Sequence, residues 1–161
     1  MRQRRRPERP TGWRRLLFRL PVHCYRLGLG WLLGTRFVLI NHVGRRSGRL
    51  RTVVVEVVDH DPRADTWTVA SGFGPTADWY RNLLATPDVS IQVGRRTIPV
   101  TARALSDDEG SGMMARYADA HPRTARRLAG FMGFEVDGSV RDYRELGRAV
   151  PFVRFVPRSA T

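Results

Sequence analysis

Short runs of β-branched and aromatic residues, separated by turn-forming residues, follow one another from residue 36 to residue 156. Each such run predicts a β-strand. The six predicted strands cover residues 36–42, 50–58, 66–71, 89–93, 97–105 and 149–156. A doubly wound parallel sheet needs a helical crossover after nearly every strand, and few of these connections are long enough to hold one. The pattern therefore predicts a mainly β fold (α+β), a six-stranded antiparallel barrel with short peripheral helices.

Helical patterns between these strands are short. The three predicted helices cover residues 78–85, 106–120 and 122–132, and residues 134–139 are expected to form a loop. Thr76 or Asp78 is the expected N-cap of the first helix, which ends before Pro87. The sequence SDDE at residues 106–109 fits a capping box that opens the second helix.

The beginning of the chain has a different pattern. Residues 1–12 are polar, rich in arginine and interrupted by proline, which predicts a disordered basic leader. Residues 13–33 predict an N-terminal amphipathic helix, kinked at Pro21, with an apolar stripe opposite a row of arginines. The leader is thus expected to precede a single domain over residues 13–161.

Two interpretations of the amphipathic helix stay open. Either its apolar face packs on its own domain, or it lies on an anionic membrane with its aromatic residues at the headgroup level. Its longest uncharged stretch, residues 27–35, is far shorter than the roughly 20 residues that span a bilayer. No signal-peptide pattern is recognisable either. We therefore expect a cytoplasmic protein, which in the second interpretation is peripheral at the inner face of the plasma membrane through residues 13–33.

Charge supports this division of the chain. The 161 residues have a formal net charge of +13, and every basic residue is arginine. Residues 1–26 hold nine arginines and one glutamate, so the leader and helix are far more basic than the rest. Such a segment suits anionic lipid or nucleic acid. A nucleic-acid-binding barrel is the weakest function class, because no strip of stacking aromatic residues accompanies the arginines, and no nucleic-acid partner is expected.

Motifs exclude several kinds of catalytic site. The single cysteine, Cys24, excludes an intrachain disulfide framework and a cysteine-rich zinc site. The four histidines are dispersed without metal-ligand spacing, so no metal is expected. No GxSxG motif and no credible acid–base pair is present. A function that needs its own catalytic side chains is therefore unsupported.

The turn GRRSGR, residues 44–49, is the first candidate binding site. Arginines gather here around Ser47, while Gly44 and Gly48 permit tight or left-handed backbone. Exposed backbone N–H groups, a hydroxyl and converging guanidinium groups suit a phosphate. The alternative is a basic surface turn without a ligand.

The second candidate is SGFGP, residues 71–75, followed by DWYRN, residues 78–82. A glycine-rich backbone beside a helix N-terminus can hold a planar ring, with amides at its polar edge. Phe73, Trp79 or Tyr80 would provide apolar cover. The alternative is that Trp79 only anchors the helix on the barrel.

Together these segments resemble the deazaflavin-dependent nitroreductase family. The resemblance runs from about residue 17 to residue 157 and rests on GRRSG with Arg51-Thr52, ASGFG (70–74), WYRNLLATPDV (79–89) and GRAVPFVRFVP (147–157). It implies a split β-barrel related to pyridoxamine-phosphate oxidases and FMN-binding proteins. It also implies an oxidoreductase that transfers a hydride from reduced coenzyme F-420, a 5-deazaflavin, to a quinone-like or nitroaromatic acceptor.

The resemblance also implies roles for residues of this chain. Arg46, Ser47, Arg51 and Thr52 would hold the phosphate and the acidic tail of the coenzyme. The deazaflavin ring would be lined by Ser71, Gly72, Gly74 and Trp79. No catalytic side chain is assigned, because the hydride chemistry belongs to the coenzyme.

The chain departs from the family pattern on the substrate side. A proline and a tyrosine usually follow Arg51-Thr52, where this chain has Val54 and Glu56. Tyr117 and Tyr143 are the candidate substitutes for the family's substrate-side tyrosines. A non-catalytic split-barrel protein that binds F-420 or FMN as a carrier or sensor therefore stays as an alternative, and the oligomeric state is left open.

Overall fold

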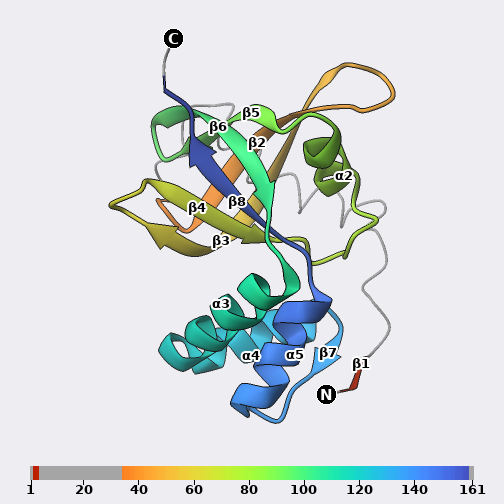
Figure 1. The fold of residues 1–161 in the computed structure, drawn as a ribbon, viewed down its shortest axis with the longest axis vertical. Helices are drawn as coiled ribbons and strands as arrows, with labels where there is room; N and C mark the ends of the chain where they lie inside the picture. The colour runs from red at the N-terminus through yellow and green to blue at the C-terminus, as the bar shows by residue number, and fades with distance from the viewer. Residues whose placement is uncertain (1, 4–33, 160–161) are drawn as a thin grey trace.

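The six long strands of the computed structural model, which describes residues 2–3 and 34–159, close into an antiparallel barrel (Figure 1). They are β2 (Phe37–Val43), β3 (Leu50–Asp61), β4 (Thr66–Ala70), β5 (Asp88–Val93), β6 (Arg96–Ala104) and β8 (Phe152–Pro157). Their order is β2-β3-β4-β8-β6-β5, and β5 pairs with β2 to complete the ring. The predicted mainly β split-barrel fold is confirmed. The predicted helix over residues 13–33 lies outside the described residues.

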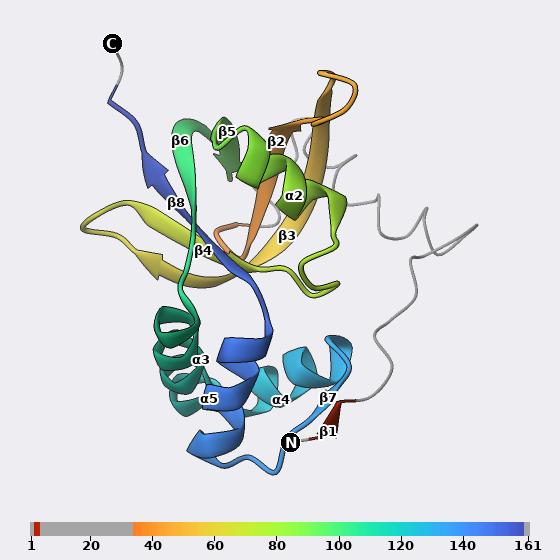
Figure 2. The same ribbon diagram turned by 45° about the vertical axis from the view of Figure 1, so that its right-hand side comes forward.

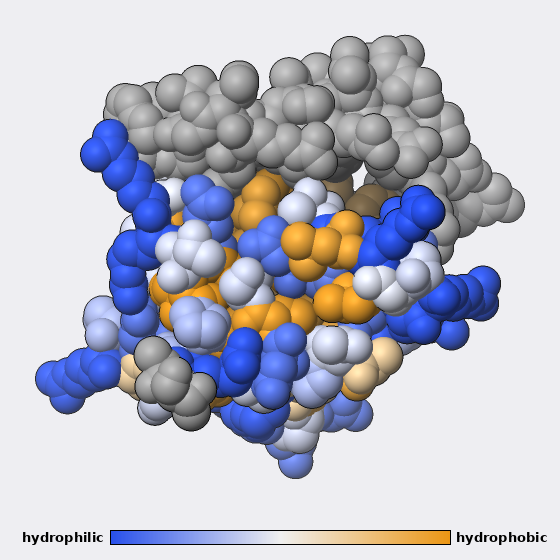
Figure 3. Space-filling model, turned by 90° about the horizontal axis from the view of Figure 1, so that it is seen from above, coloured by the Kyte–Doolittle hydropathy of each residue, from blue (hydrophilic) through white to orange (hydrophobic). Residues whose placement is uncertain are grey.

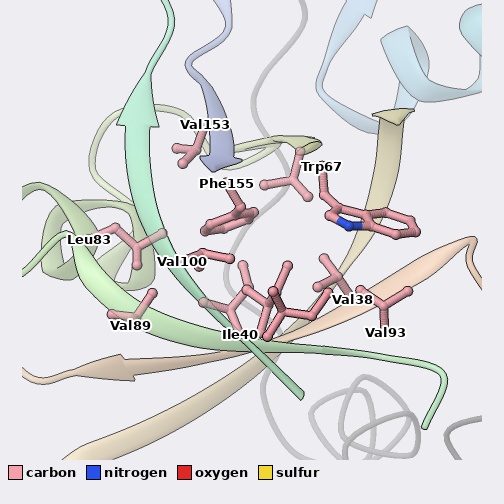
Figure 4. Close-up of a cluster of buried hydrophobic side chains, with 12 residues drawn as sticks. Val38, Ile40, Trp67, Leu83, Val89, Val93, Val100, Val153 and Phe155 are labelled. Carbon is pink, nitrogen blue, oxygen red and sulfur yellow. The ribbon is translucent and has the colours of Figure 1, made fainter. Parts of the chain in front are cut away.

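The barrel interior is filled by side chains that alternate along the strands. Val38 and Ile40 of β2 have no exposed surface, and Trp67 of β4 is only 2% exposed. Residues two apart in a strand point to the same face, which explains why these side chains meet inside the barrel. Figure 4 shows this cluster, with Leu83 entering it from the side.

The helices occupy two separate places. They are α2 (Asp78–Ala85), α3 (Asp107–Ala120), α4 (Pro122–Phe131) and α5 (Val140–Ala149). α2 lies beside the upper part of the barrel, whereas α3, α4 and α5 form a helical layer at its lower end in both Figure 1 and Figure 2. The layer has its own apolar core, which includes Met113, Met114 and Leu146. None of the described helices is both long and apolar enough to span a bilayer.

A two-stranded sheet borders the helical layer. Its strands are β1 (Arg2–Gln3) and β7 (Phe134–Glu135), which pair antiparallel. These residues differ from the prediction, since β1 falls in the expected disordered leader and β7 in the expected loop. Each strand has two residues, too few for a sequence pattern to reveal.

Helix α5 was not predicted. The helix covers Val140–Ala149, and its N-cap is Ser139, whose hydroxyl accepts a hydrogen bond from the Asp142 backbone N–H. Its buried side carries Tyr143, Leu146 and Gly147, while most other positions are charged. Because α5 has few large apolar residues, its helical period is weak in the sequence. The helix itself depends on packing against α3. Consequently β8 begins at Phe152 and not at residue 149.

Two other predicted boundaries were wrong. Strand β3 continues through the expected turn to Asp61, because a bulge between Val57 and Asp59 preserves its pairing with β4. The N-cap of α2 is Ala77 without a side-chain hydrogen bond, in place of Thr76 or Asp78. Ala77 is buried at 7% exposure, so packing of the incoming loop decides where the helix begins.

The predicted capping box of α3 is confirmed. Ser106 Oγ accepts from the Glu109 backbone N–H at 3.2 Å, and Glu109 Oε1 accepts from the Ser106 N–H at 3.2 Å. Arg103 also donates two hydrogen bonds to the Glu109 carboxylate, at 3.1 and 3.0 Å. The Arg103 guanidinium is the main reason why the pKa of Glu109 falls to about 2. The carboxylate therefore stays charged at every ordinary pH and fixes the start of α3 to β6.

The helical layer depends on a close crossing of α3 and α5. A Cβ atom on Gly147 would overlap the carbonyl oxygen of Gly110, and one on Gly110 would lie 2.5 Å from the carbonyl oxygen of Gly147. The two backbones are therefore in direct contact. Gly110, which weakens a helix by intrinsic propensity, is required here for packing.

Substitution of Gly147 tests this crossing. We expect Gly147→Ala to lower the free energy of unfolding by about 1 to 3 kcal/mol, because backbone must move to admit the methyl group. The measurement is urea denaturation followed by circular dichroism. The matched control is Gly130→Ala, since a Cβ there meets no atom within 4 Å and alanine favours the helix. Equal stability of the two variants would contradict the close crossing.

Candidate cofactor site

The turn between β2 and β3 has a fixed internal structure. The Gly44 N–H donates to the Arg49 carbonyl at 2.8 Å, and the Gly48 N–H donates to the Gly44 carbonyl at 2.8 Å. Gly48 has φ +68°, which favours glycine. A Cβ on Gly44 would lie 2.5 Å from Ser47 Oγ. The turn therefore favours glycine at Gly48 through its backbone conformation, whereas a methyl group at Gly44 would displace the Ser47 hydroxyl.

The arginines of this turn are not equivalent. Arg46, Arg49 and Arg51 are exposed, and their guanidinium groups have no ion pair or hydrogen bond within residues 2–3 and 34–159. Arg45, in contrast, is half-buried and lies 3.3 Å from Asp78 Oδ1. Three positive charges are thus left unneutralised around Ser47, which is the arrangement that an anionic group requires.

Asn82 of α2 is the buried centre that fixes the turn. Its Oδ1 accepts from the Arg45 backbone N–H at 3.1 Å and from Arg45 Nη1 at 2.9 Å. Its Nδ2 donates to His42 Nδ1 at 3.0 Å. Asn82 and His42 are 2% and 4% exposed. One amide therefore ties α2 both to the turn and to the end of β2.

His42 is held in its neutral form. The pKa of His42 falls from 6.5 to about 4, mainly because the ring is buried and also because the positive Arg51 is near, while Asp78 opposes the shift. The hydrogen bond from Asn82 also requires an unprotonated Nδ1 on His42. His42 thus supports the turn without adding a charge to it.

The glycine-rich loop before α2 is closed by Ser71. Ser71 is fully buried, its Oγ donates to the Gly74 carbonyl at 2.7 Å, and the Gly74 N–H donates to the Ser71 carbonyl at 2.9 Å. Gly74 has φ +81°, so this position also favours glycine. The hydroxyl of Ser71 is therefore used within the loop, where it fixes the backbone between Ser71 and Gly74.

The remaining part of the loop contacts α4. A Cβ on Gly72 would lie 3.4 Å from a ring carbon of Phe131, and Phe73 meets Phe131 edge-on at 6.2 Å between ring centroids. Gly72 itself is half-buried. The loop thus connects the helical layer to the start of α2.

The first turn of α2 presents Trp79. This side chain is half-buried against the barrel core and meets Tyr80 edge-on, with ring centroids 6.3 Å apart. The N-cap Ala77 supplies no side-chain hydrogen bond to the first amides of the helix. Trp79 therefore anchors α2 on the barrel, beside a helix N-terminus without a side-chain cap.

The predicted site residues form two groups that α2 joins. Arg46, Ser47, Arg51 and Thr52 belong to the β2–β3 turn and the strand that follows it, and Arg45 links this turn to Asn82 and Asp78. The loop that precedes α2 contains Ser71, Gly72 and Gly74. No described contact joins the loop directly to the turn. Helix α2 is thus the shared element of the candidate site.

The surface at this end of the barrel is mixed. Seen from above in Figure 3, strongly hydrophilic residues lie at the rim and hydrophobic residues lie nearer the centre. Leu50 after the turn and Leu84 of α2 are 70% and 55% exposed. A ligand with charged groups and an apolar ring would find both kinds of surface here.

Sequence reasoning missed His42 and Asn82 as supporting residues. His42 follows Val38 and Ile40 at a spacing of two, on the inward face of β2, which is a signal that it is buried. Asn82 precedes Leu83, the apolar anchor of α2, and nothing in the sequence shows which partner its amide meets.

The two tyrosines suggested for the substrate side lie in the helical layer. Tyr117 is in α3, where its ring lies 5.3 Å from that of His121, and burial raises its pKa. Tyr143 is in α5 and is 4% exposed. Both belong to the helical layer, at the opposite end of the molecule from the β2–β3 turn (Figure 2). Neither is therefore placed at the turn.

A six-stranded barrel with an arginine-rich turn fixed to a helix agrees with the comparisons with known proteins. The family model of the F420H(2)-dependent quinone reductases matches residues 17–130. The chain belongs to this family and is an F-420-dependent reductase.

Individual relatives agree with this assignment. Protein Rv3178 of Mycobacterium tuberculosis (strain ATCC 25618 / H37Rv), which is assigned to the F420H(2)-dependent quinone reductases, is 35% identical over 98 residues, or 60% of this chain and 81% of the relative. The solved structure of the F420-H2 dependent reductase FDR-A has a TM-score of 0.51 at 24% identity, covering 74% of this chain and 93% of that one. Protein Atu2129 of Agrobacterium tumefaciens str. C58 has a TM-score of 0.55 at 15% identity, covering 95% and 59%. The two structures support the fold.

The buried His42 predicts a pH dependence of stability. The unfolded chain binds a proton at His42 below pH 6.5, whereas the folded chain does so only below about 4. The free energy of unfolding should therefore rise with pH across this window, by at most about 3 kcal/mol. Urea denaturation at a series of pH values measures it. His42→Gln should flatten the slope between pH 4 and 6.5, and an unchanged slope would contradict the assignment.

Proposed function

We propose that this reductase transfers a hydride from reduced F-420 to a quinone-like or nitroaromatic acceptor, and that Arg46, Ser47, Arg51 and Thr52 bind the phosphate and the acidic tail of the coenzyme. The observation that carries the site assignment is the set of unneutralised arginines on a turn that Asn82 holds in place. A polyanionic coenzyme supplies the negative charges that the described chain lacks there.

The residues present fit this coenzyme. The Ser47 hydroxyl and the arginines supply donors for phosphate oxygens, and Gly48 keeps the backbone open at the tip of the turn. The loop backbone at Gly72 and Gly74, shaped by Ser71, and the N-terminal amides of α2 near Trp79 would face the polar edge of the ring. FMN, the alternative cofactor, has fewer negative charges to use on the same turn.

When bound, the reduced coenzyme supplies the two-electron hydride chemistry. The chain's own residues bind, orient and shield. The arginines would hold the anionic end, and α2 would keep the turn and the glycine-rich loop in a fixed relation to each other. His42 holds the turn through Asn82, and because its Nδ1 is already occupied, this nitrogen takes no proton from a ligand. Orientation of this kind is the main protein contribution when a cofactor carries the reaction.

A fluorescence titration with oxidised F-420 at physiological salt tests the site. We expect saturable binding, with Kd raised about tenfold by Arg46→Ala and by Arg51→Ala, because each variant loses a charge-assisted hydrogen bond. Arg63→Ala is the matched control, since Arg63 is an exposed arginine on the β3–β4 turn. Equal, small effects of all three variants would refute the phosphate site. Tighter binding of FMN in the parallel titration would refute the choice of cofactor.

We also propose that residues 13–33 contact anionic lipid, where quinones dissolve. The support is the sequence alone, with its arginines opposite an apolar stripe. The protein should sediment with phosphatidylglycerol vesicles and not with phosphatidylcholine vesicles, and salt should release it. The combined variant Arg15→Gln, Arg19→Gln and Arg26→Gln should lose this binding, while Arg63→Gln keeps it. Equal binding to both kinds of vesicle would contradict the proposal.

A further inference from the structure

A cavity of about 480 Å³ opens among α3, α4 and α5. Cavities of this size hold drug-sized organic molecules. It lies in the helical layer, whereas the β2–β3 turn lies at the opposite end of the molecule in both ribbon views (Figures 1 and 2). The cavity is thus separate from the proposed phosphate site.

Most of the cavity wall is apolar. Ala115 and Ala118 of α3 face Pro122 at the start of α4 and Val140 at the start of α5. Val140 is 61% exposed although it is aliphatic. A ligand with a hydrocarbon or aromatic body would cover surface that otherwise contacts water.

The Tyr143 hydroxyl is an unpaired polar group in this wall. Tyr143 lines the cavity and is 4% exposed, and its hydroxyl has no hydrogen-bond partner in the part of the chain that the structure describes. The fully enclosed, unpaired side-chain polar atoms of that part are Trp67 Nε1 and Ser111 Oγ. Since the Tyr143 hydroxyl is not one of them, this atom is not fully enclosed, and its side chain lines the cavity. A phenol in this position is ready to donate to a ligand atom.

Two arginines place positive charge on the same wall. Arg123 has no described partner, and Arg126 Nη2 makes only a long contact of 3.5 Å to the Asp137 carbonyl. Asp119 also lines the cavity, so the charged groups of the wall sum to one positive charge. The balance favours a ligand with a single negative charge.

We propose that this cavity is a second small-molecule site, which binds an amphipathic monoanion, an alkyl or aryl carboxylate or sulfonate. Arg123 and Arg126 bind the anionic group, the alanines and Val140 cover its apolar body, and the Tyr143 hydroxyl donates to an oxygen of the ligand. No chemistry occurs there.

The test is a fluorescence titration of the full chain, without coenzyme, with the aryl sulfonate 8-anilinonaphthalene-1-sulfonate at physiological salt. We expect one saturable site, with Kd raised roughly five- to tenfold by Arg123→Gln or Arg126→Gln and about threefold by Tyr143→Phe. Octanoate should compete, while octylammonium and octanol should not. Circular dichroism and urea midpoints equal to those of the parent protein show that each variant is folded.

Two matched controls separate this site from other basic surfaces. Arg127→Gln changes an exposed arginine of α4 that does not line the cavity, and Arg46→Ala changes the proposed phosphate site. Neither should alter the titration. The proposal is overturned by an absence of saturable binding, by equal losses in Arg127→Gln and Arg126→Gln, or by competition from octanol as strong as that from octanoate. Loss of binding in Arg46→Ala would place the probe at the turn and also overturn it.

Discussion

The hydrogen bonds of one buried amide hold the candidate cofactor site together. Asn82 accepts two hydrogen bonds from Arg45 and donates one to His42, so a single side chain connects a strand, a turn and a helix. Each of these groups would be costly to leave unpaired in a buried place. The position of the turn that carries the exposed arginines therefore depends on a buried contact within the protein.

The distribution of ion pairs gives the turn its character. Some arginines elsewhere in the described chain are matched by carboxylates, as in the pairs Arg96–Asp65 at 2.7 Å and Arg103–Glu109 at 3.0 Å. Those pairs fix a hairpin and a helix start. Within the turn, only Arg45 is matched in this way. The turn is distinguished by the close sequence spacing of three exposed arginines, Arg46, Arg49 and Arg51, that have no carboxylate partner in the described chain.

The sequence was informative where local patterns decide the structure. The bounds of strand β5 and helix α2 were predicted nearly correctly, because turn-forming residues lie on both sides of each. The capping box at Ser106 was predicted from four consecutive residues. Helix α5 was missed because its stability comes from contact with α3, and a single sequence does not contain that contact. The turn at Ser47 was recognisable from its glycines and arginines. Its support by Asn82 was not, since the two segments are distant in the chain.

Adjacent residues of α2 serve two unrelated partners. Leu83 enters the apolar interior of the barrel, while Asn82 meets the turn outside it. Neighbouring residues of a helix project about 100° apart, so these two attachments fix the rotation of α2 about its own axis. An insertion of one residue in α2 before Asn82 would rotate the preceding residues of the helix by about 100° relative to these two attachments. Length variation among relatives should therefore gather in the hairpin around Arg63 and be absent from the segment between Gly74 and Asn82.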